Sequence, residues 1–309
     1  MLTIVIFTGG RYNYLYQLLN DLSKLKISIW IVDFNKKKIQ QKEYQDIKKK
    51  KIKLILTDKC SSYSERFVKY INLIKTKYVW FIGDDDRVES TYLKELILFL
   101  KKSNYSGFTL GYKTFVNEPP IKKKSQLIKI ISERLNIFKD IHNLGMLSTQ
   151  IINTKNYKMI SKNLNVKNLT KSLYPQTDII IKIISKFNNW QKINNTLVYY
   201  RINNFNLSKK NLLIRLDAEF KGYLVPLKQQ YNHNDVSVLY QKIFFKNIIS
   251  WIIYCIINVG KKETFRVLKN NIKIIPFIFY IHFITAIIFI MPLSIILIVR
   301  KIKKELTSK

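Results

Sequence analysis

The chain has 309 residues, 47% of them hydrophobic, which is enough for one large domain with an appendage or for two modest domains. Its formal net charge is +34, but only 8 of its 54 basic residues are Arg. Arg is the better fork for phosphates and bases, so a charge carried by Lys argues against a nucleic-acid partner. A compositional bias toward Lys, Ile and Asn explains the charge most simply, and attraction to an anionic membrane surface is the alternative.

The first hundred residues alternate continuous apolar runs with apolar residues at helical spacing. Continuous apolar strands separated by helices are typical of a parallel sheet that is covered on both faces. We therefore predict an α/β fold with a mostly parallel sheet flanked by helices. The expected strands are residues 2–7, 27–32, 52–56 and 78–82, and the expected helices lie around residues 15–25, 67–74 and 93–100.

Polar residues follow three of these strands, namely Thr8, Asp33 and the acidic run 84–86. Ligands of open α/β sheets bind beyond the carboxyl ends of the strands, where these residues are expected. Three adjacent carboxylates repel one another and are costly behind an apolar strand unless a cation neutralises them. Mg²⁺ or Mn²⁺ takes oxygen ligands and commonly links protein carboxylates to substrate phosphates. An acidic turn balanced by Arg87 is the simpler alternative.

The middle of the chain is less regular. We expect strands over residues 107–112, 147–152 and 197–201, and a helix that carries Asp178 in its first turn. An Asn-rich segment follows the last of these strands and marks a plausible boundary. The predicted domains are residues 1–205 and residues 206–309.

The final third of the chain changes character. Residues 238–259 suggest an amphipathic helix, and residues 274–299 contain no Asp, Glu, Lys or Arg. A helix of that second length would measure about 39 Å, enough to cross a hydrocarbon core of about 30 Å. Basic residues on both flanks favour a re-entrant or in-plane arrangement, broken at Pro292, over a single span. A buried helical hairpin is the alternative to this membrane-associated region.

Several segments resemble the family 2 glycosyltransferases of the GT-A fold. Residues 2–8 with Arg11 are similar to their opening strand and turn, and residues 30–33 to their second strand with its acidic end. Residues 64–66 and 77–86 resemble their helix and the strand that bears a DxD motif. The Gly-Asp-Asp-Asp form looks most like the abequosyltransferase-like branch, which decorates bacterial surface polysaccharides. The resemblance covers about residues 1–205.

The resemblance implies a role for each matching residue. In the family pattern, the nucleotide sugar would contact Thr8, Arg11, Asp33, Arg66, Asp84 and Asp85, and the metal ion would be held by Asp86 and Asp84. Asp178 would be the catalytic base that deprotonates the acceptor hydroxyl. A carboxylate that is simply favoured by the helix dipole is an equally good interpretation of Asp178.

Two features depart from the family pattern. The paired acids after the second strand are reduced to Asp33-Phe34, and the opening turn reads Thr8-Gly9-Gly10. The identity of the nucleotide therefore stays open.

Together these features predict a metal-dependent glycosyltransferase, and the family resemblance implies that it inverts the configuration of the transferred sugar. It would move a sugar from a nucleotide-sugar donor to a glycan or polyprenyl-linked acceptor of bacterial surface polysaccharide. Because residues 2–7 read as a buried strand and not as a signal peptide, we expect it at the cytoplasmic face of the inner membrane. Two alternatives are a metal-dependent nucleotidyl- or phospho-transferase and a non-enzymatic, basic, membrane-associated binding protein.

Overall fold

The computed structural model describes the chain in two compact units. The sheet unit comprises Met1–Leu135, Asn143–Lys171 and Pro175–Phe205, and the helical unit comprises Asn136–His142, Ser172–Tyr174 and Asn206–Lys309. The residues that the structure describes are 1–23, 25–35, 52–57, 62–119, 129–164, 169, 174–202, 209–276, 279–292 and 294–295.

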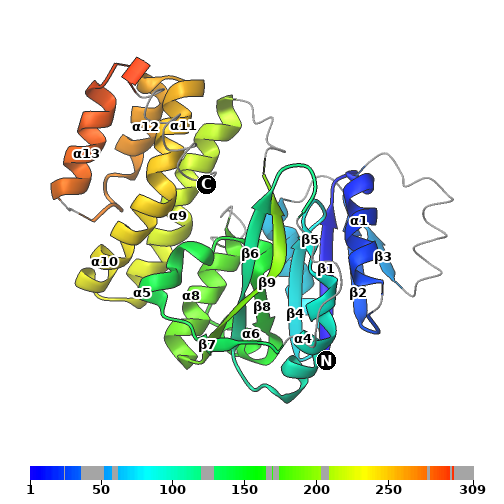
Figure 1. Ribbon diagram of the computed structural model, residues 1–309. Helices are drawn as coiled ribbons and strands as arrows, with labels where there is room; N and C mark the ends of the chain where they lie inside the picture. The colour runs from blue at the N-terminus through cyan, green and yellow to red at the C-terminus, as the bar shows by residue number, and fades with distance from the viewer. Residues whose placement is uncertain are drawn as a thin grey trace. The chain divides into compact units, whose positions relative to one another are not determined.

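In the described part of the chain, nine strands form one sheet in the sheet unit (Figure 1). Eight of them follow the order β3-β2-β1-β4-β8-β6-β9-β5, and β7 pairs with β9. The strands are β1 (Leu2–Thr8), β2 (Ser28–Asp33), β3 (Lys53–Leu56), β4 (Tyr78–Gly83), β5 (Arg87–Val88), β6 (Gly107–Phe115), β7 (Ser132–Arg134), β8 (Gln150–Asn153) and β9 (Trp190–Arg201).

The sheet is mixed, so the prediction of a mostly parallel sheet is right only for part of it. Strands β3, β2, β1 and β4 are parallel to one another, as β6 is to β9. Strand β8 runs antiparallel to both β4 and β6, and β9 runs antiparallel to β5 and β7. Continuous apolar runs indicate burial on both faces of a strand and carry no information on its direction.

Helices cover both faces of this sheet. The predicted strand over residues 147–152 is correct only in its second half, because its first half forms a 3₁₀ turn. The helical elements of the sheet unit are α1 (Tyr12–Leu22), α3 (Tyr63–Leu73), α4 (Ser90–Lys102), the 3₁₀ turn η2 (Leu147–Thr149), α6 (Thr154–Ser161) and α8 (Pro175–Phe187).

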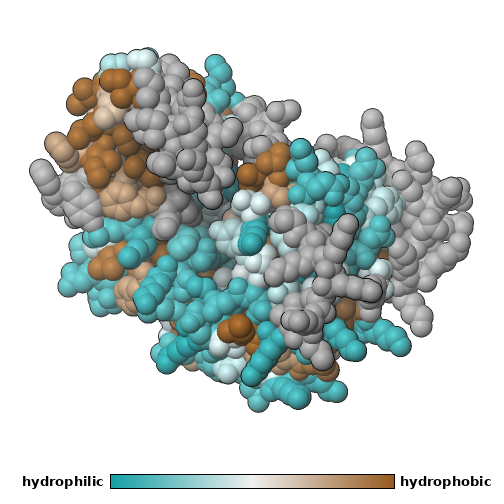
Figure 2. All heavy atoms as spheres, in the orientation of Figure 1, coloured by the Kyte–Doolittle hydropathy of each residue, from teal (hydrophilic) through white to brown (hydrophobic). Residues whose placement is uncertain are grey.

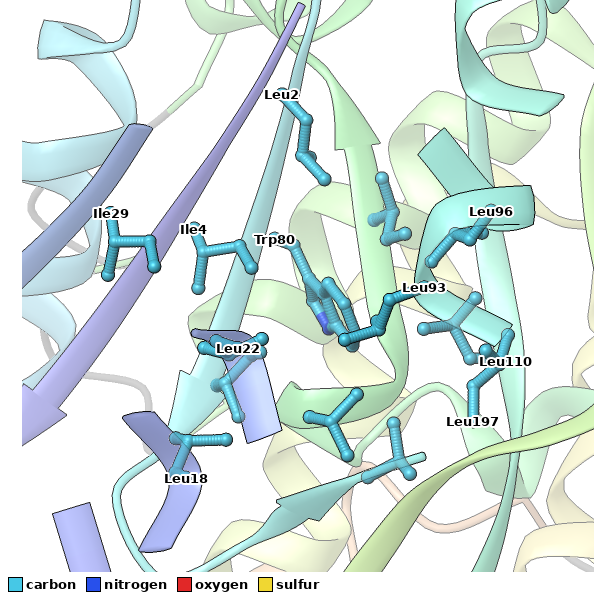
Figure 3. Packing of buried hydrophobic residues seen from close by; sticks show 14 of the residues in the cluster. Leu2, Ile4, Leu18, Leu22, Ile29, Trp80, Leu93, Leu96, Leu110 and Leu197 are labelled. Carbon is cyan, nitrogen blue, oxygen red and sulfur yellow. The ribbon is translucent and has the colours of Figure 1, made fainter. Parts of the chain in front are cut away.

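Alternation along the strands divides the core into two layers, because successive side chains point to opposite faces. Ile4 and Trp80 belong to a buried cluster with residues of α1 and α4 (Figure 3). Phe7 and Phe81 point the other way and stack on each other at 5.7 Å between ring centroids, while Phe67 of α3 lies 4.4 Å from Phe81. Strands β1 and β4 are therefore buried on both faces along nearly their whole length, and β1 ends in the polar residue Thr8.

The helical unit contains α5 (Ile137–Asp140), α9 (Lys209–Gln230), α10 (His233–Ile243), the π-helical turn η3 (Phe244–Ile248), α11 (Ile249–Asn258), α12 (Lys261–Asn271) and α13 (Phe279–Ile290), and the 3₁₀ turn η1 (Ile141–Asn143) joins it to the sheet unit. The expected helix over residues 238–259 is thus continuous through its π-helical turn. Among the described residues, no helix has both the length and the apolar composition that a membrane crossing requires. Of the predicted stretch 274–299, α13 occupies twelve residues, and residues 277–278, 293 and 296–299 lie outside the described residues.

Candidate active site

The carboxyl ends of three neighbouring strands bring the predicted site residues to one edge of the sheet. Thr8, the last residue of β1, pairs in register with Asp33, the last residue of β2. On the other side of β1, Phe7 pairs with Gly83 of β4. Asp84 therefore follows directly beside Thr8. The structure thus brings Thr8, Asp33 and the start of the acidic run together, as predicted.

The acidic run forms a tight turn in which like charges lie close together. The Asp86 backbone N–H donates to the Gly83 carbonyl oxygen at 3.2 Å. A Cβ atom at Gly83 would lie 3.1 Å from Asp85 Oδ1 and 3.3 Å from Asp86 Oδ2. A side chain at this position would therefore crowd the two carboxylates that lie over the end of β4. We name residues 84–86 the acidic loop.

Arg11 neutralises the outer part of the acidic loop. Its Nη1 pairs with Asp85 Oδ2 at 2.6 Å, and its Nη2 pairs with Asp84 Oδ1. Asp84 has no exposed side-chain surface, and burial raises its pKa, an effect that Arg11 and the Thr8 hydroxyl partly offset. Arg11 itself is 47% exposed. The guanidinium is thus the accessible positive group above carboxylates that lie mostly out of solvent.

Asp86 lies deepest in the loop and is held from two sides. The Ser148 hydroxyl donates to its Oδ2, and the Arg201 backbone N–H donates to its Oδ1 at 3.2 Å. Burial, reinforced by the negative charges of Asp85 and Asp84, raises the pKa of Asp86 to about 7, although these two hydrogen bonds act in the opposite direction. Without a metal ion, the protonated form of this carboxyl group is therefore favoured to a higher pH than in an exposed Asp.

Arg201 organises the loop with its side chain as well as its backbone. Its Nε donates to the Asp85 carbonyl oxygen at 3.0 Å, and its Nη1 donates to the carbonyl oxygens of Val116 and Asn117. Its guanidinium also stacks over the rings of Tyr14 and Phe115, at 4.2 and 4.4 Å. One side chain at the end of β9 thus links the acidic loop to α1 and to the end of β6.

Ser148 and Arg201 are not among the site residues predicted from the sequence, and Arg87 has a different partner from the one predicted. Arg87 does not balance the acidic loop, because it makes a two-pronged ion pair with Asp21 of α1 at 2.6 and 2.7 Å. The scarcity of Arg in the sequence could have indicated that Arg201 belongs to the site. Four of the eight Arg residues, Arg11, Arg66, Arg87 and Arg201, lie in or beside the edge that carries the loop.

Asp33 and Arg66 form a second part of the edge. Tyr12 donates its hydroxyl to Asp33 Oδ2 at 2.7 Å, and the Asn35 backbone N–H donates to Oδ1 at 2.8 Å. The Arg66 guanidinium stacks over the Phe34 ring at 3.9 Å, and burial lowers its pKa. Phe34 occupies the position where the family pattern has a second acid, and it contacts Arg66 there through its ring.

The start of α3 explains how Arg66 is positioned. Ser62 caps the helix by accepting a hydrogen bond from the Glu65 backbone N–H at 3.1 Å, and Glu65 Oε2 accepts from the Ser62 backbone N–H at 2.7 Å. This reciprocal capping box fixes the first turn of the helix. Arg66 follows at once and points from that turn toward Phe34.

Asp178 lies in the first turn of α8, as predicted, and is partly exposed. Its Oδ1 forms an ion pair with Lys182 at 2.9 Å. Its neighbours anchor the helix start: Gln176 donates to the Gly145 carbonyl oxygen at 2.9 Å and accepts from the Tyr63 hydroxyl at 3.4 Å. No described hydrogen bond or ion pair joins Asp178 to the acidic loop, so its role as a base stays a prediction.

The residues present can supply part of a metal site. Oδ2 of Asp84 is buried and has no hydrogen-bond partner in the described part of the chain. That orphaned oxygen and the Asp86 carboxylate are hard ligands of the kind that Mg²⁺ or Mn²⁺ prefers. The described residues contain no group of three or more His, Cys, Asp or Glu side chains placed to hold an ion. A metal here would therefore depend on substrate phosphates and water for its remaining ligands.

Comparison with known proteins gives a family match and similar folds. The family model described as glycosyl transferase family 2 matches residues 3–167, more than half of the chain. Residues 1–349 of TarS from S. aureus, in complex with UDP-GlcNAc, are similar in structure, with a TM-score of 0.65 and 14% identity over 89% of this chain and 81% of that chain. A second crystal structure of TarS residues 1–349 gives a TM-score of 0.60 and 13% identity over 86% of this chain and 80% of that chain. No protein of curated function matches in sequence.

The buried carboxyl group of Asp86 leads to a stability prediction. Its folded pKa, about 7, lies above the unfolded value of about 3.9, so ionising it in the folded protein costs stability as pH rises from about 4 to about 7. We expect Asp86→Asn to change stability little at pH 4. Above pH 7 it should stabilise the protein by up to about 4 kcal/mol.

Urea unfolding between pH 4 and 8 in the presence of EDTA measures this difference. Glu133→Gln is the matched control, because it removes a carboxylate that is 59% exposed on β7, away from the acidic loop. A stability difference for Asp86→Asn that does not depend on pH would contradict the account.

Proposed function

This chain belongs to glycosyl transferase family 2, and from that membership we propose that it transfers a sugar from a UDP sugar to an acceptor hydroxyl. The observation that supports this most strongly is the acidic loop, assembled at the carboxyl edge of the sheet and braced there by Ser148 and Arg201. TarS fragments with this fold are described in complex with UDP-GlcNAc and with UDP, which favours a uridine donor and makes UDP-GlcNAc the first to test.

In this proposal the donor binds across the edge formed by β1, β2 and β4. Asp33, already oriented by Tyr12, would accept hydrogen bonds from the nucleoside. Arg11, the exposed cation at the edge, would attract the diphosphate. Because a guanidinium pairs well with either group, a diphosphate could draw Arg11 away from Asp84 and Asp85. The donor would thereby uncover the two carboxylates that its sugar must approach.

Asp86 and Asp84 would hold Mg²⁺ or Mn²⁺. Such an ion stabilises the nucleoside diphosphate as it leaves. Ser148 and Arg201 fix the Asp86 carboxylate on the side away from solvent and limit where it can move. The raised pKa of Asp86 means that a proton and a cation compete for the same oxygens, so metal binding should weaken as pH falls below about 7.

Asp178 would act as the base of an inverting single displacement. Its carboxylate would remove the proton of the acceptor hydroxyl as that oxygen attacks the anomeric carbon and the nucleoside diphosphate departs. Lys182, four residues further along α8, pairs with this carboxylate at 2.9 Å and would help to orient it. Support for this role is its partly exposed position at the start of a buried helix.

We also propose that the acceptor is a bacterial surface glycan or its polyprenyl-linked precursor, as in the abequosyltransferase-like branch, and that transfer occurs at the cytoplasmic face of the inner membrane. Helix α13 supports the membrane part of this proposal. It is hydrophobic on all sides, a pattern typical of helices that are buried. Nevertheless Phe283 is 57% and Ile290 80% exposed. Figure 2 shows hydrophobic residues gathered where α13 lies in Figure 1.

The donor is tested by transfer of labelled GlcNAc from UDP-GlcNAc to membranes of a strain from which the gene has been deleted. The wild-type protein should incorporate label with Mg²⁺ or Mn²⁺ and lose this activity in EDTA. Asp86→Asn should be stable but inactive, because an amide is a poor ligand for a hard cation. Full activity in that variant would remove the acidic loop from the mechanism, and consumption of a free nucleoside triphosphate would favour a nucleotidyltransferase.

The base is tested by Asp178→Asn in the same assay. Loss of a general base should lower kcat by about 10² to 10⁴ with little change in donor affinity. Lys182→Met is the control, because it removes the ion pair and leaves the carboxylate in place. If Asp178→Asn lowers kcat no more than Lys182→Met does, the carboxylate only stabilises the start of the helix.

Membrane attachment is tested by co-sedimentation with phosphatidylglycerol vesicles. Replacing both Phe283 and Ile290 by Glu should reduce binding at least about tenfold, because two apolar side chains lose their insertion energy. Leu73 and Leu98, which are 50% and 45% exposed in the sheet unit, provide the matched pair of Glu substitutions. Equal binding by both double variants would show that α13 is not the attachment site.

A further inference from the structure

A hollow rich in Lys lies in the sheet unit, at the edge of the sheet opposite the acidic loop. It has a volume of about 790 Å³. Its walls come from the segment before β4 and from the length of α6. Strand β8, which ends beside the start of β4, runs antiparallel to it. At about 3.3 Å per residue, the six residues of β4 separate it from the acidic loop by about 20 Å. The residues that line it are Lys75, Thr76, Lys77, Thr154, Lys155, Lys158, Met159 and Lys162.

The floor of this hollow is firmly held. The Thr154 hydroxyl donates to the Thr76 carbonyl oxygen at 2.6 Å, and the Thr154 backbone N–H donates to the Lys77 carbonyl oxygen at 3.0 Å. Lys77 Nζ donates to the carbonyl oxygen of Ser103 and to Asn104 Oδ1. The start of α6 is thus hydrogen-bonded to the segment before β4. These bonds fix the backbone from which the lysine side chains extend.

The rim of the hollow concentrates positive charge. Lys155, Lys158 and Lys162 are exposed and recur at a spacing that puts them on one face of α6 and its last turn. Lys75 is exposed opposite them, and no lining residue is acidic. Like charges at this spacing repel one another, so an anion bound among them would gain from all four.

We propose that this hollow binds an extended polyanion, a chain of repeated phosphate or carboxylate groups, that belongs to the acceptor glycan. Met159 is the one apolar residue among those that line it, so the walls offer little to a nucleobase or to a lipid tail. Ammonium groups act as point charges and suit anions that repeat along a chain. The volume is far larger than a single phosphate needs.

Its distance from the acidic loop separates it from the donor site. A chain held about 20 Å from the reacting sugar would raise acceptor affinity without touching the transferred group. The role as an acceptor site rests on the proposed glycosyl transfer, whereas the binding itself does not. A binding assay therefore tests the hollow even if the proposed reaction is wrong.

The test compares two triple variants by fluorescence anisotropy with labelled inorganic polyphosphate and with labelled polygalacturonate. Lys155→Gln/Lys158→Gln/Lys162→Gln removes three charges from the rim. Lys94→Gln/Lys101→Gln/Lys102→Gln removes three exposed charges from α4, elsewhere in the sheet unit. Gln keeps helix propensity close to that of Lys, so both variants should fold.

We expect the α6 variant to bind at least one of the two polyanions at least tenfold more weakly, with a shallower dependence on salt, and the α4 variant to lose less than about threefold. The probe that loses affinity distinguishes a phosphate chain from a carboxylate chain. Thermal stabilisation by UDP-GlcNAc should be the same in both variants, which separates this site from the donor site.

Equal losses in the two variants would mean that only net charge matters and would overturn the proposal. Unchanged binding of both polyanions by the α6 variant would overturn it as well. So would weaker binding of the α6 variant to phosphatidylglycerol vesicles without any effect on the polyanions, because the hollow would then be a membrane contact.

Discussion

The mutual repulsion of three consecutive carboxylates is the constraint on which the rest of this site depends. Asp84 and Asp86 are almost completely buried, and burial raises the pKa of each. The fold tolerates this through a guanidinium above the loop, a hydroxyl beneath it and the end of β9 beside it. Burying like charges together lowers the stability of the fold. Their presence here therefore indicates a functional role for the acidic loop.

The side chains that hold the acidic loop in place include arginines, although Arg is scarce in this chain. Lys is abundant, yet the groups that pair with or stack beside the edge are Arg11, Arg66 and Arg201, and Arg87 joins α1 to β5 through Asp21. A guanidinium offers several fixed donors and a flat face, which Arg201 uses at once on carbonyl oxygens and aromatic rings. In a chain this rich in Lys, the position of an Arg therefore helps to locate the candidate site.

Sequence patterns predicted those parts of the site whose causes are local. Strands β1, β2 and β4 are predicted by their apolar runs. When such strands are parallel, the polar residue after each run must lie at the same edge of the sheet, and Thr8, Asp33 and the acidic loop were predicted in this way. The reciprocal cap of α3 is likewise visible as Ser62 and Glu65.

The remaining features depend on residues far apart in the chain. Ser148 and Arg201 reach Asp86 from 62 and 115 residues away, through a 3₁₀ turn and a strand whose partners no local pattern specifies. The antiparallel part of the sheet was not predicted, because the pairing of its strands also depends on residues far apart in the chain. Asp178 is a further case, because a carboxylate that opens a helix has the same local sequence whether it caps or catalyses.

Hydrogen exchange in the presence of UDP-GlcNAc and Mg²⁺ tests most directly that the braced acidic loop is the donor site. The account predicts that the donor slows amide exchange in peptides that contain residues 8–12, 83–88 and 199–202, where the loop and its supports lie. Slowed exchange confined to other segments, such as residues 75–77 and 154–162 at the opposite edge of the sheet, would contradict it.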